Sequence, residues 1–170
     1  MTRDQKIVAV GAGSGVLTMV LAMWLLAGML PAPASLETTG DRLAYALRWA
    51  AFAALPLFAM IVAIGNARAL GPAIDPTLGV EDKAMIVNGR VADNTLQQFA
   101  LFLAGSLGLA ASLPPRDMTV IGAAAIVFVG ARIAFWIGYR IDPLYRAFGF
   151  AATAYLNLGL LLAALWFALS

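Results

Sequence analysis

The sequence predicts an all-α integral membrane protein, and its composition and long apolar runs lead to that class. Of its 170 residues, 62% are hydrophobic and 12% are charged, and the mean hydropathy is +0.88. A typical soluble domain has roughly 45–50% apolar and about 25% charged residues. The apolar residues gather in long runs, and a helix of about 20 such residues crosses the hydrocarbon core of a bilayer. We therefore expect the chain to lie in a lipid bilayer.

The residue types that are missing narrow the chemistry. The chain has no cysteine and no histidine, which excludes disulfides and removes the commonest metal ligand and general base. We expect no metal site. The net charge of +2 is too small to indicate a nucleic-acid partner. Any chemistry must use other side chains, such as those of Arg, Tyr, Asp, Glu, Ser or Thr, or a bound small molecule.

The first predicted span is Ile7–Leu30, which contains no charged residue and is long enough to cross the membrane. Its Gly11, Gly13 and Gly15 suit a close contact with another helix. Ala32-Pro33-Ala34 resembles a signal-peptide cleavage site, but the apolar run is longer than the usual roughly 7–15 residues. We expect this helix to remain as a membrane span.

Four further spans complete the prediction. Pro56 is expected to kink the first of them, and Gly105 and Gly108 in the second offer a close-packing surface. These spans cover about Arg42–Ala67, Asn94–Leu113, Met118–Tyr139 and Leu144–Leu169, and the longest polar segment is Asn66–Asp93. We divide the chain into an additional N-terminal helix with its loop, residues 1–41, and a four-helix membrane domain, residues 42–170.

The basic residues between the spans predict the orientation. With the N-terminus in the cytoplasm, more basic residues lie on the cytoplasmic side, as the positive-inside rule requires. The C-terminus then lies on the opposite side, and the segments around Arg90 and Arg146 reach the same membrane face. The cytoplasmic set is Arg3, Lys6, Arg68, Lys83, Arg90, Arg140 and Arg146, and the opposite set is Arg42, Arg48 and Arg116.

A polar stripe enters the third span. If this segment is helical, Arg90, Asn94 and Gln97 lie on one face because they stand at i, i+4 and i+7. Charged and amide side chains in a bilayer are costly unless they face protein, water or a ligand. The stripe is therefore the first candidate for a functional site.

A second stripe lies at the end of the fourth span. Arg132, Phe135 and Tyr139 stand at i, i+3 and i+7, and Arg146 follows after one short loop. Arginines grouped in this way bind carboxylates or phosphates. The residues alone leave a second interpretation open, in which these groups pair with acidic side chains, backbone carbonyls or lipid phosphates.

Three linked segments resemble motifs of the membrane-associated proteins in eicosanoid and glutathione metabolism, the MAPEG family. Residues 90–103 read RVADNTLQQFALFL and resemble the family's R-x-x-x-N-x-x-E motif. Residues 132–139, RIAFWIGY, resemble R-x-x-Y-x-x-G-Y, and residues 143–150, PLYRAFGF, resemble P-x-x-R-x-x-G-F. Their order and spacing agree with the family over about residues 45–168.

The resemblance implies a four-helix fold that assembles as a homotrimer and holds glutathione between subunits at the cytoplasmic face. Arg146 matches the arginine that stabilises the glutathione thiolate, with Tyr139 assisting. Arg68 is a candidate contact from the adjacent subunit. The positions that match the family's glutathione contacts are Arg90, Asn94, Gln97, Arg132 and Tyr139.

Three positions depart from the family pattern. Gln97 replaces a glutamate, Phe135 replaces the first tyrosine, and Ala100 replaces a proline. Two functions follow from the resemblance. One is a glutathione-dependent transferase or peroxidase that acts on a lipophilic electrophile from the bilayer. The other is a non-catalytic member that binds a lipid or a partner protein. A transporter has weaker support, because no acidic residue lies within a span.

Overall fold

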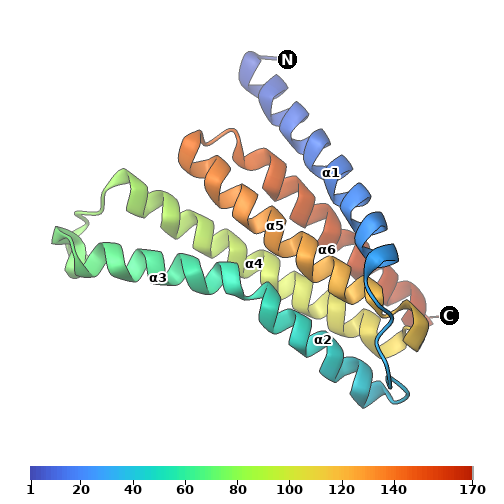
Figure 1. Ribbon diagram of the computed structural model, residues 1–170. Helices are drawn as coiled ribbons and strands as arrows, with labels where there is room; N and C mark the ends of the chain where they lie inside the picture. Colours follow the sequence, from blue (N-terminus) through green and yellow to red (C-terminus); the bar gives the residue numbers. More distant parts are fainter. Residues whose placement is uncertain (170) are drawn as a thin grey trace.

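The computed structural model describes residues 1–169, and the described chain is helical (Figure 1). Five helical segments are long and apolar enough to cross a membrane. The helices are α1 (Arg3–Met29), α2 (Thr39–Ala53), α3 (Leu55–Ala69), α4 (Lys83–Ser112), α5 (Thr119–Ile141) and α6 (Arg146–Leu169), with short 3₁₀ helices η1 (Pro72–Ile74), η2 (Pro76–Leu78) and η3 (Pro115–Asp117). The predicted multi-pass membrane fold is confirmed.

The predicted kink at Pro56 is confirmed and divides one span into α2 and α3. Pro56 has no N–H group, so it cannot bond to the carbonyl of Phe52 as a helical residue would. The helix is interrupted at Ala54, and the ribbon changes direction there (Figure 1). As a result α2 packs on both α4 and α5, while α3 packs mainly on α4.

The start of α4 differs from the sequence prediction. We predicted a membrane span from about Asn94, and the helix that carries it begins earlier, at Lys83. The Asp82 side chain accepts a hydrogen bond from the Met85 backbone N–H at 2.7 Å, which caps the helix locally. Asn88 is buried and its Oδ1 accepts a hydrogen bond from Trp136 Nε1 at 2.9 Å. The helix can include this polar segment because the Asn88 side-chain amide has a hydrogen-bond partner on α5.

Glycines let helices approach closely at several contacts. A Cβ on Gly105 would lie 2.9 Å from Leu160 Cβ, and one on Gly108 would lie 3.3 Å from Ala164 Cβ, so α4 and α6 meet along this face. A Cβ on Gly149 would overlap the Ala131 carbonyl oxygen, so α6 also presses on α5. Small residues at such contacts are a common packing device in membranes.

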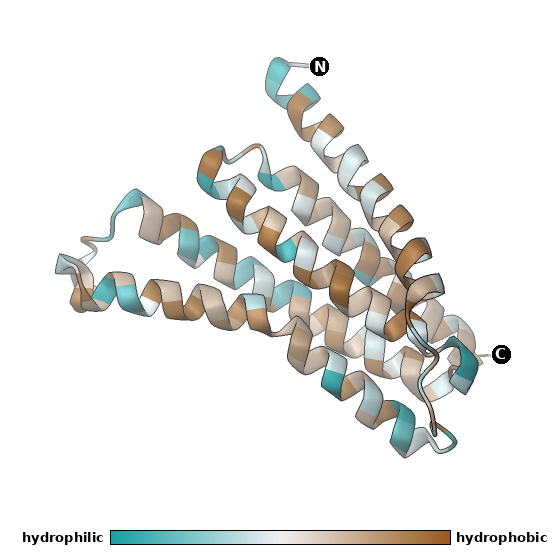
Figure 2. Ribbon diagram, in the orientation of Figure 1, coloured by the Kyte–Doolittle hydropathy of each residue, from teal (hydrophilic) through white to brown (hydrophobic). Residues whose placement is uncertain are grey.

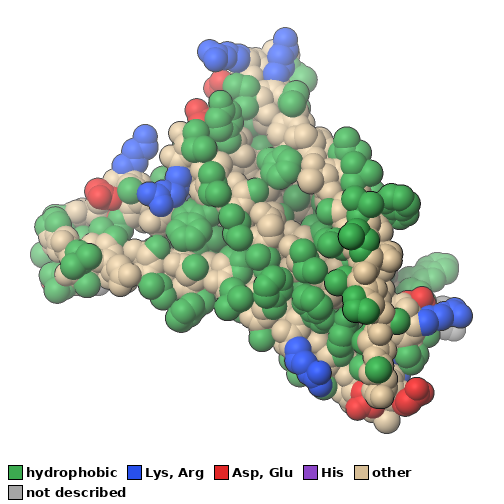
Figure 3. Space-filling view, in the orientation of Figure 1, with side chains coloured by type: hydrophobic (Ala, Val, Ile, Leu, Met, Phe, Trp, Pro, Cys, Tyr) green, Lys and Arg blue, Asp and Glu red, His purple; other side chains and the backbone are tan. Residues whose placement is uncertain are grey.

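The buried core lies between α4, α5 and α6 and is rich in alanine and phenylalanine. Phe102 and Phe128 pack with ring centroids 4.8 Å apart. Hydrophobic residues also run along the outside of the helices (Figure 2), and on the face seen in Figure 3 most charged side chains lie toward the helix ends. This distribution is typical of a protein that exposes an apolar belt to lipid.

The helix ends divide between two sides of the bundle. The N-terminus, the α3–α4 loop and the α5–α6 loop lie on one side, and the C-terminus and the α4–α5 turn lie on the other (Figure 1). The predicted placement of Arg90 and Arg146 toward one side is therefore confirmed. The cytoplasmic assignment of that side stays a prediction.

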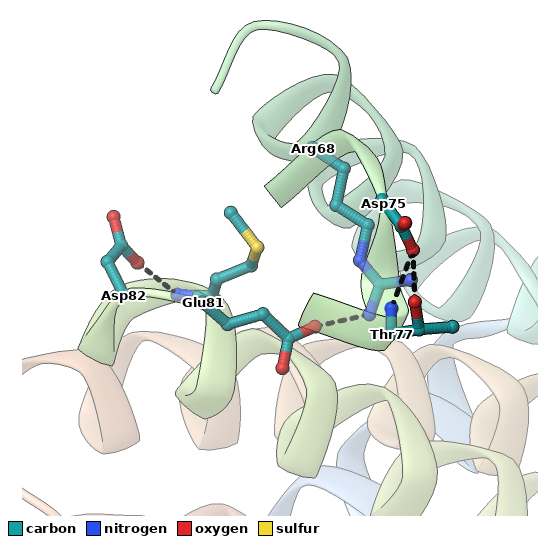
Figure 4. Close-up of polar contacts among 6 residues, drawn as sticks. Arg68, Asp75, Thr77, Glu81 and Asp82 are labelled. Atoms are coloured by element: carbon teal, nitrogen blue, oxygen red, sulfur yellow. Dashed lines mark hydrogen bonds and ion pairs between the residues drawn. The ribbon is translucent and has the colours of Figure 1, made fainter. Parts of the chain in front are cut away.

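The α3–α4 loop is held by polar contacts that Figure 4 shows. Arg68 at the end of α3 forms an ion pair with Glu81. The Asp75 carboxylate accepts hydrogen bonds from the Thr77 hydroxyl and backbone N–H, at 2.6 and 2.9 Å. These bonds hold the pKa of the Asp75 carboxyl below its usual value, the hydroxyl having the larger effect. Within this chain Arg68 therefore pairs with a residue of the α3–α4 loop.

Candidate functional site

A pocket of about 640 Å³ lies near the α5–α6 loop, on the same side of the bundle as the N-terminus. Four helices contribute to its wall. Its polar residues are Arg90 and Asn94 on α4, Tyr139 on α5 and Arg146 at the start of α6. Its remaining lining comes from α1, α5, α6 and the α5–α6 loop and is apolar except for the hydroxyl of Tyr155. The pocket thus has a polar part and an apolar part.

Arg146 and Tyr139 form a pair within the pocket. Arg146 Nη1 donates a hydrogen bond to the Tyr139 hydroxyl oxygen at 2.9 Å. The guanidinium carbon also lies 5.0 Å from the centroid of the Tyr139 ring, within the range of a cation–π contact. Because the hydroxyl oxygen accepts from Arg146, its proton remains available to a ligand.

Phe135 packs against the Tyr139 ring of this pair. It is buried, and its ring meets the Tyr139 ring edge to face with centroids 5.8 Å apart. The Arg132 guanidinium carbon lies 4.2 Å from the centroid of the same Phe135 ring. Phe135 thus contacts both Arg132, which is fully buried outside the pocket lining, and Tyr139, which lines the pocket.

Arg132 is fully buried and makes three side-chain hydrogen bonds. Nη1 donates to Asn94 Oδ1 at 2.9 Å, and Nη2 donates to the Gly149 carbonyl at 3.1 Å and to the Thr153 hydroxyl at 2.7 Å. The Asn94 oxygen is thereby occupied, which leaves its NH₂ group as a donor. Arg132 acts on the pocket through Asn94, because it does not itself line the pocket.

The polar part of the pocket presents donors to a ligand. Arg90 and Arg146 carry positive charge, and Asn94 and Tyr139 offer an amide and a hydroxyl proton. The described residues that line the pocket include no carboxylate. A group of donors with two positive charges and an apolar neighbourhood attracts an anion, since charges interact strongly where water is scarce.

The predicted site residues fall into two groups. The pocket brings Arg90, Asn94, Tyr139 and Arg146 together, as the two sequence stripes predicted. Arg132 lies behind the pocket, and Gln97 is exposed on α4 outside its lining. Glutathione contacts by these two residues stay a prediction.

The outward face of α4 carries polar side chains that form no hydrogen bond or ion pair with other described residues. Arg90, Asp93 and Gln97 are exposed there, and the hydrogen bonds and ion pairs found among residues 1–169 do not include their side chains. The helix α4 also has the lowest mean hydropathy of the five candidate spans. A polar face of this kind within a membrane helix needs another surface beside it.

The sequence analysis missed part of the pocket wall. Val8 and Ala12 of α1 line the pocket, although α1 lies outside the quoted motifs. Thr153 and Gly149, the partners of Arg132, were not predicted either. The small-residue pattern of α1 indicated a helix contact, but its target could not be read from one sequence.

Long apolar helices define an integral membrane protein, and this one carries a positively charged pocket toward one end of its helix bundle. The sequence model of the MAPEG family matches residues 46–166, and the chain belongs to this family. The match begins within α2, so α1 lies before it, and the resemblance of the three motifs is confirmed. Comparison with curated proteins and with solved structures gave no match.

Proposed function

We propose that the protein binds glutathione in this pocket and joins it through its sulfur to a lipophilic electrophile. Alternatively, it uses two glutathione molecules to reduce a lipophilic peroxide to an alcohol and water, with glutathione disulfide as the oxidised product. The observation that carries this proposal is the donor-only polar part beside an apolar wall. Glutathione brings two carboxylates, which suit Arg90 and Asn94. A lipophilic second substrate suits the apolar part, which it can enter from the bilayer.

Arg146 is the residue proposed to stabilise the thiolate. A thiol has a pKa of about 8.5, and a guanidinium beside it favours the ionised form, which is the nucleophile. Tyr139 can donate its hydroxyl proton to the same sulfur, because its oxygen accepts from Arg146. In conjugation the thiolate forms the new carbon–sulfur bond, and the electrophile releases its leaving group or takes up a proton.

The proposed assembly is a homotrimer with the pocket completed at the subunit contact. The exposed polar face of α4, with Arg90, Asp93 and Gln97, supports this arrangement because those groups need partners in the membrane. Native mass spectrometry of the detergent-solubilised protein measures the assembly directly. A trimer is expected, and a monomer at every protein concentration would contradict it.

Calorimetry with glutathione tests the proposed function. The wild-type protein is expected to bind glutathione, and Arg90→Ala is expected to weaken that binding about tenfold or more, because a charge-assisted contact is lost. Arg116→Ala is the matched control, since Arg116 is exposed in η3, within the α4–α5 turn that lies on the opposite side of the bundle (Figure 1). The absence of any glutathione binding by the wild-type protein would overturn the proposal.

A second candidate is non-catalytic lipid binding, which Phe135 and the apolar part of the pocket favour. Phe135 replaces a hydroxyl-bearing residue of the family motif, and the apolar wall can hold an acyl chain. A retained lipid in native mass spectra, together with no effect of glutathione on thermal unfolding, would select this function. Turnover of a lipophilic electrophile would exclude it.

A further inference from the structure

The helix that precedes the family match forms part of the pocket. Val8 and Ala12 of α1 stand at i and i+4, so they share one helix face, and both line the pocket beside α6. The family match covers residues 46–166, so this wall comes from outside the matched domain. The lining from α1 is apolar, whereas Arg90, Asn94, Tyr139 and Arg146 come from the other helices.

The position of α1 is set by contacts with the backbone of α6. Gly15 is buried, and a Cβ there would overlap the carbonyl oxygen of Phe148. A Cβ on Gly11 would lie 3.3 Å from Ala147 Cβ. Ala147 also lines the pocket. The glycine contacts therefore set how closely α1 approaches α6 beside the pocket. A helix that contacts the backbone of its neighbour so closely has little room to shift relative to it.

The apolar wall continues from α1 onto α6. Ala151 and Ala154 of α6 line the pocket together with Val8 and Ala12. Alanine side chains leave space that a larger side chain would fill. A ligand whose charged groups bind the arginines can therefore place an apolar group between α1 and α6.

We propose that α1 determines which apolar groups the site accepts: its Val8 and Ala12 form the wall against which the hydrophobic substituent on the glutathione sulfur lies. The inference rests on the proposed function, because Arg90 and Asn94 must hold the carboxylates of the ligand and Arg146 must lie beside its sulfur. The wall sets the size of the substituent, and the polar part holds the glutathione moiety. Ala12 is thus a specificity-determining residue of the reaction.

The opposite face of α1 supplies a matched control. A Cβ on Gly13 would meet no atom within 4 Å, and Gly13 is exposed. Gly13→Phe therefore adds the same side chain to the same helix without entering the pocket. Ala12→Phe instead fills the apolar part of the pocket.

Calorimetry with two ligands, glutathione and S-hexylglutathione, tests the inference. The wild-type protein is expected to bind the hexyl derivative more tightly, because burial of methylene groups is favourable. Ala12→Phe is expected to weaken binding of S-hexylglutathione about tenfold, as when about two methylene groups leave the pocket. Binding of glutathione itself is expected to change less than about twofold. Gly13→Phe is expected to bind both ligands as the wild type does.

Different outcomes separate this inference from the proposed function. If the wild type binds glutathione but Ala12→Phe keeps the full preference for the hexyl derivative, α1 is not the wall and the inference is overturned. If the wild type binds neither ligand, the proposed function fails, and the inference fails with it. Thermal unfolding shows whether Ala12→Phe folds. If it does not, Val8→Trp places a large side chain on the same wall, and its binding of the two ligands is measured instead.

Discussion

Arg146 donates a hydrogen bond to the Tyr139 hydroxyl at 2.9 Å while its guanidinium stands over the same ring. The pair joins the first turn of α6 to the last turn of α5 across the short loop between them. It fixes a positive charge and a hydroxyl proton side by side at the edge of an apolar pocket. This is an arrangement that can hold and ionise a thiol.

The first prediction concerns the pH dependence of bound glutathione. In the wild type, Arg146 should lower the pKa of the bound thiol below the usual value of about 8.5. Arg146→Ala removes the positive charge, so the pKa should rise and the thiolate should form only at higher pH. Thiolate absorbance against pH measures this shift, with Arg116→Ala as control. Identical titrations in wild type and Arg146→Ala would contradict the role of Arg146.

The second prediction concerns Arg132. Arg132→Met leaves Asn94, Gly149 and Thr153 without the donor that they share. We expect a loss of about 2–4 kcal/mol of stability, because buried hydrogen-bonding groups become unsatisfied. Thermal unfolding in detergent measures it. Arg140→Met, at an exposed position near the end of the same helix, should change stability by no more than about 0.5 kcal/mol. Equal midpoints for the two variants would show that Arg132 is not structural.

The third prediction tests the approach of α6 to α5. Gly149→Ala places a Cβ against the backbone of Ala131 and Phe135, so the helices must separate. We expect a cost of about 1–3 kcal/mol, typical of overpacking, and weaker hydrogen bonding of Arg132. Gly159→Ala on the same helix is the control, because a Cβ there meets nothing within 4 Å. A Gly149→Ala variant as stable as the control would refute the close contact.

The fourth prediction tests the docking of α1 in the membrane. The chain has no cysteine, so an introduced pair reports a single contact. Gly11→Cys with Ala147→Cys should form a disulfide, since the Cβ positions lie about 3.3 Å apart, near the distance that a disulfide requires. Gly13→Cys with Ala147→Cys should not, because a Cβ at position 13 meets no atom within 4 Å. Mobility on non-reducing gels distinguishes the two, and equal cross-linking would disprove the docking.

The fifth prediction concerns orientation. Val80→Cys lies in the α3–α4 loop and Glu37→Cys in the α1–α2 loop, and both positions are exposed. With the N-terminus in the cytoplasm, an impermeant maleimide should label only Glu37→Cys in right-side-out vesicles. Both variants should react once detergent opens the membrane. Labelling of Val80→Cys alone would reverse the orientation.

Much of the fold could be predicted, because membrane spans and helix breaks depend on the residues of the segment itself. The apolar runs predicted five spans, and Pro56 predicted the break between α2 and α3. The apolar run predicted a span from about Asn94, and the helix that carries this span extends back to Lys83. Asn88 is stabilised in the helix by Trp136 of α5, and a contact between distant residues cannot be found from local composition.

Gly13 shows the limit of a pattern argument within one helix. The sequence predicted Gly11, Gly13 and Gly15 at a helix contact, but Gly13 faces away from the bundle. A period of 3.6 residues places neighbours four apart on one face and neighbours two apart on different faces. Gly11 and Gly15 therefore meet α6, and the prediction for Gly13 was wrong.

The sequence by itself determined the class of protein, the membrane spans, the family motifs and the side of the bundle where the polar stripes end. These depend on composition and on periodicity along single helices. Only the tertiary structure decided that Arg132 turns into the bundle toward Thr153 while Arg146 stays in the pocket with Tyr139. It also decided that α1 forms a wall of that pocket. The physical reason is that helix faces are chosen by packing, and Gly15 and Gly149 set that packing through close backbone contacts.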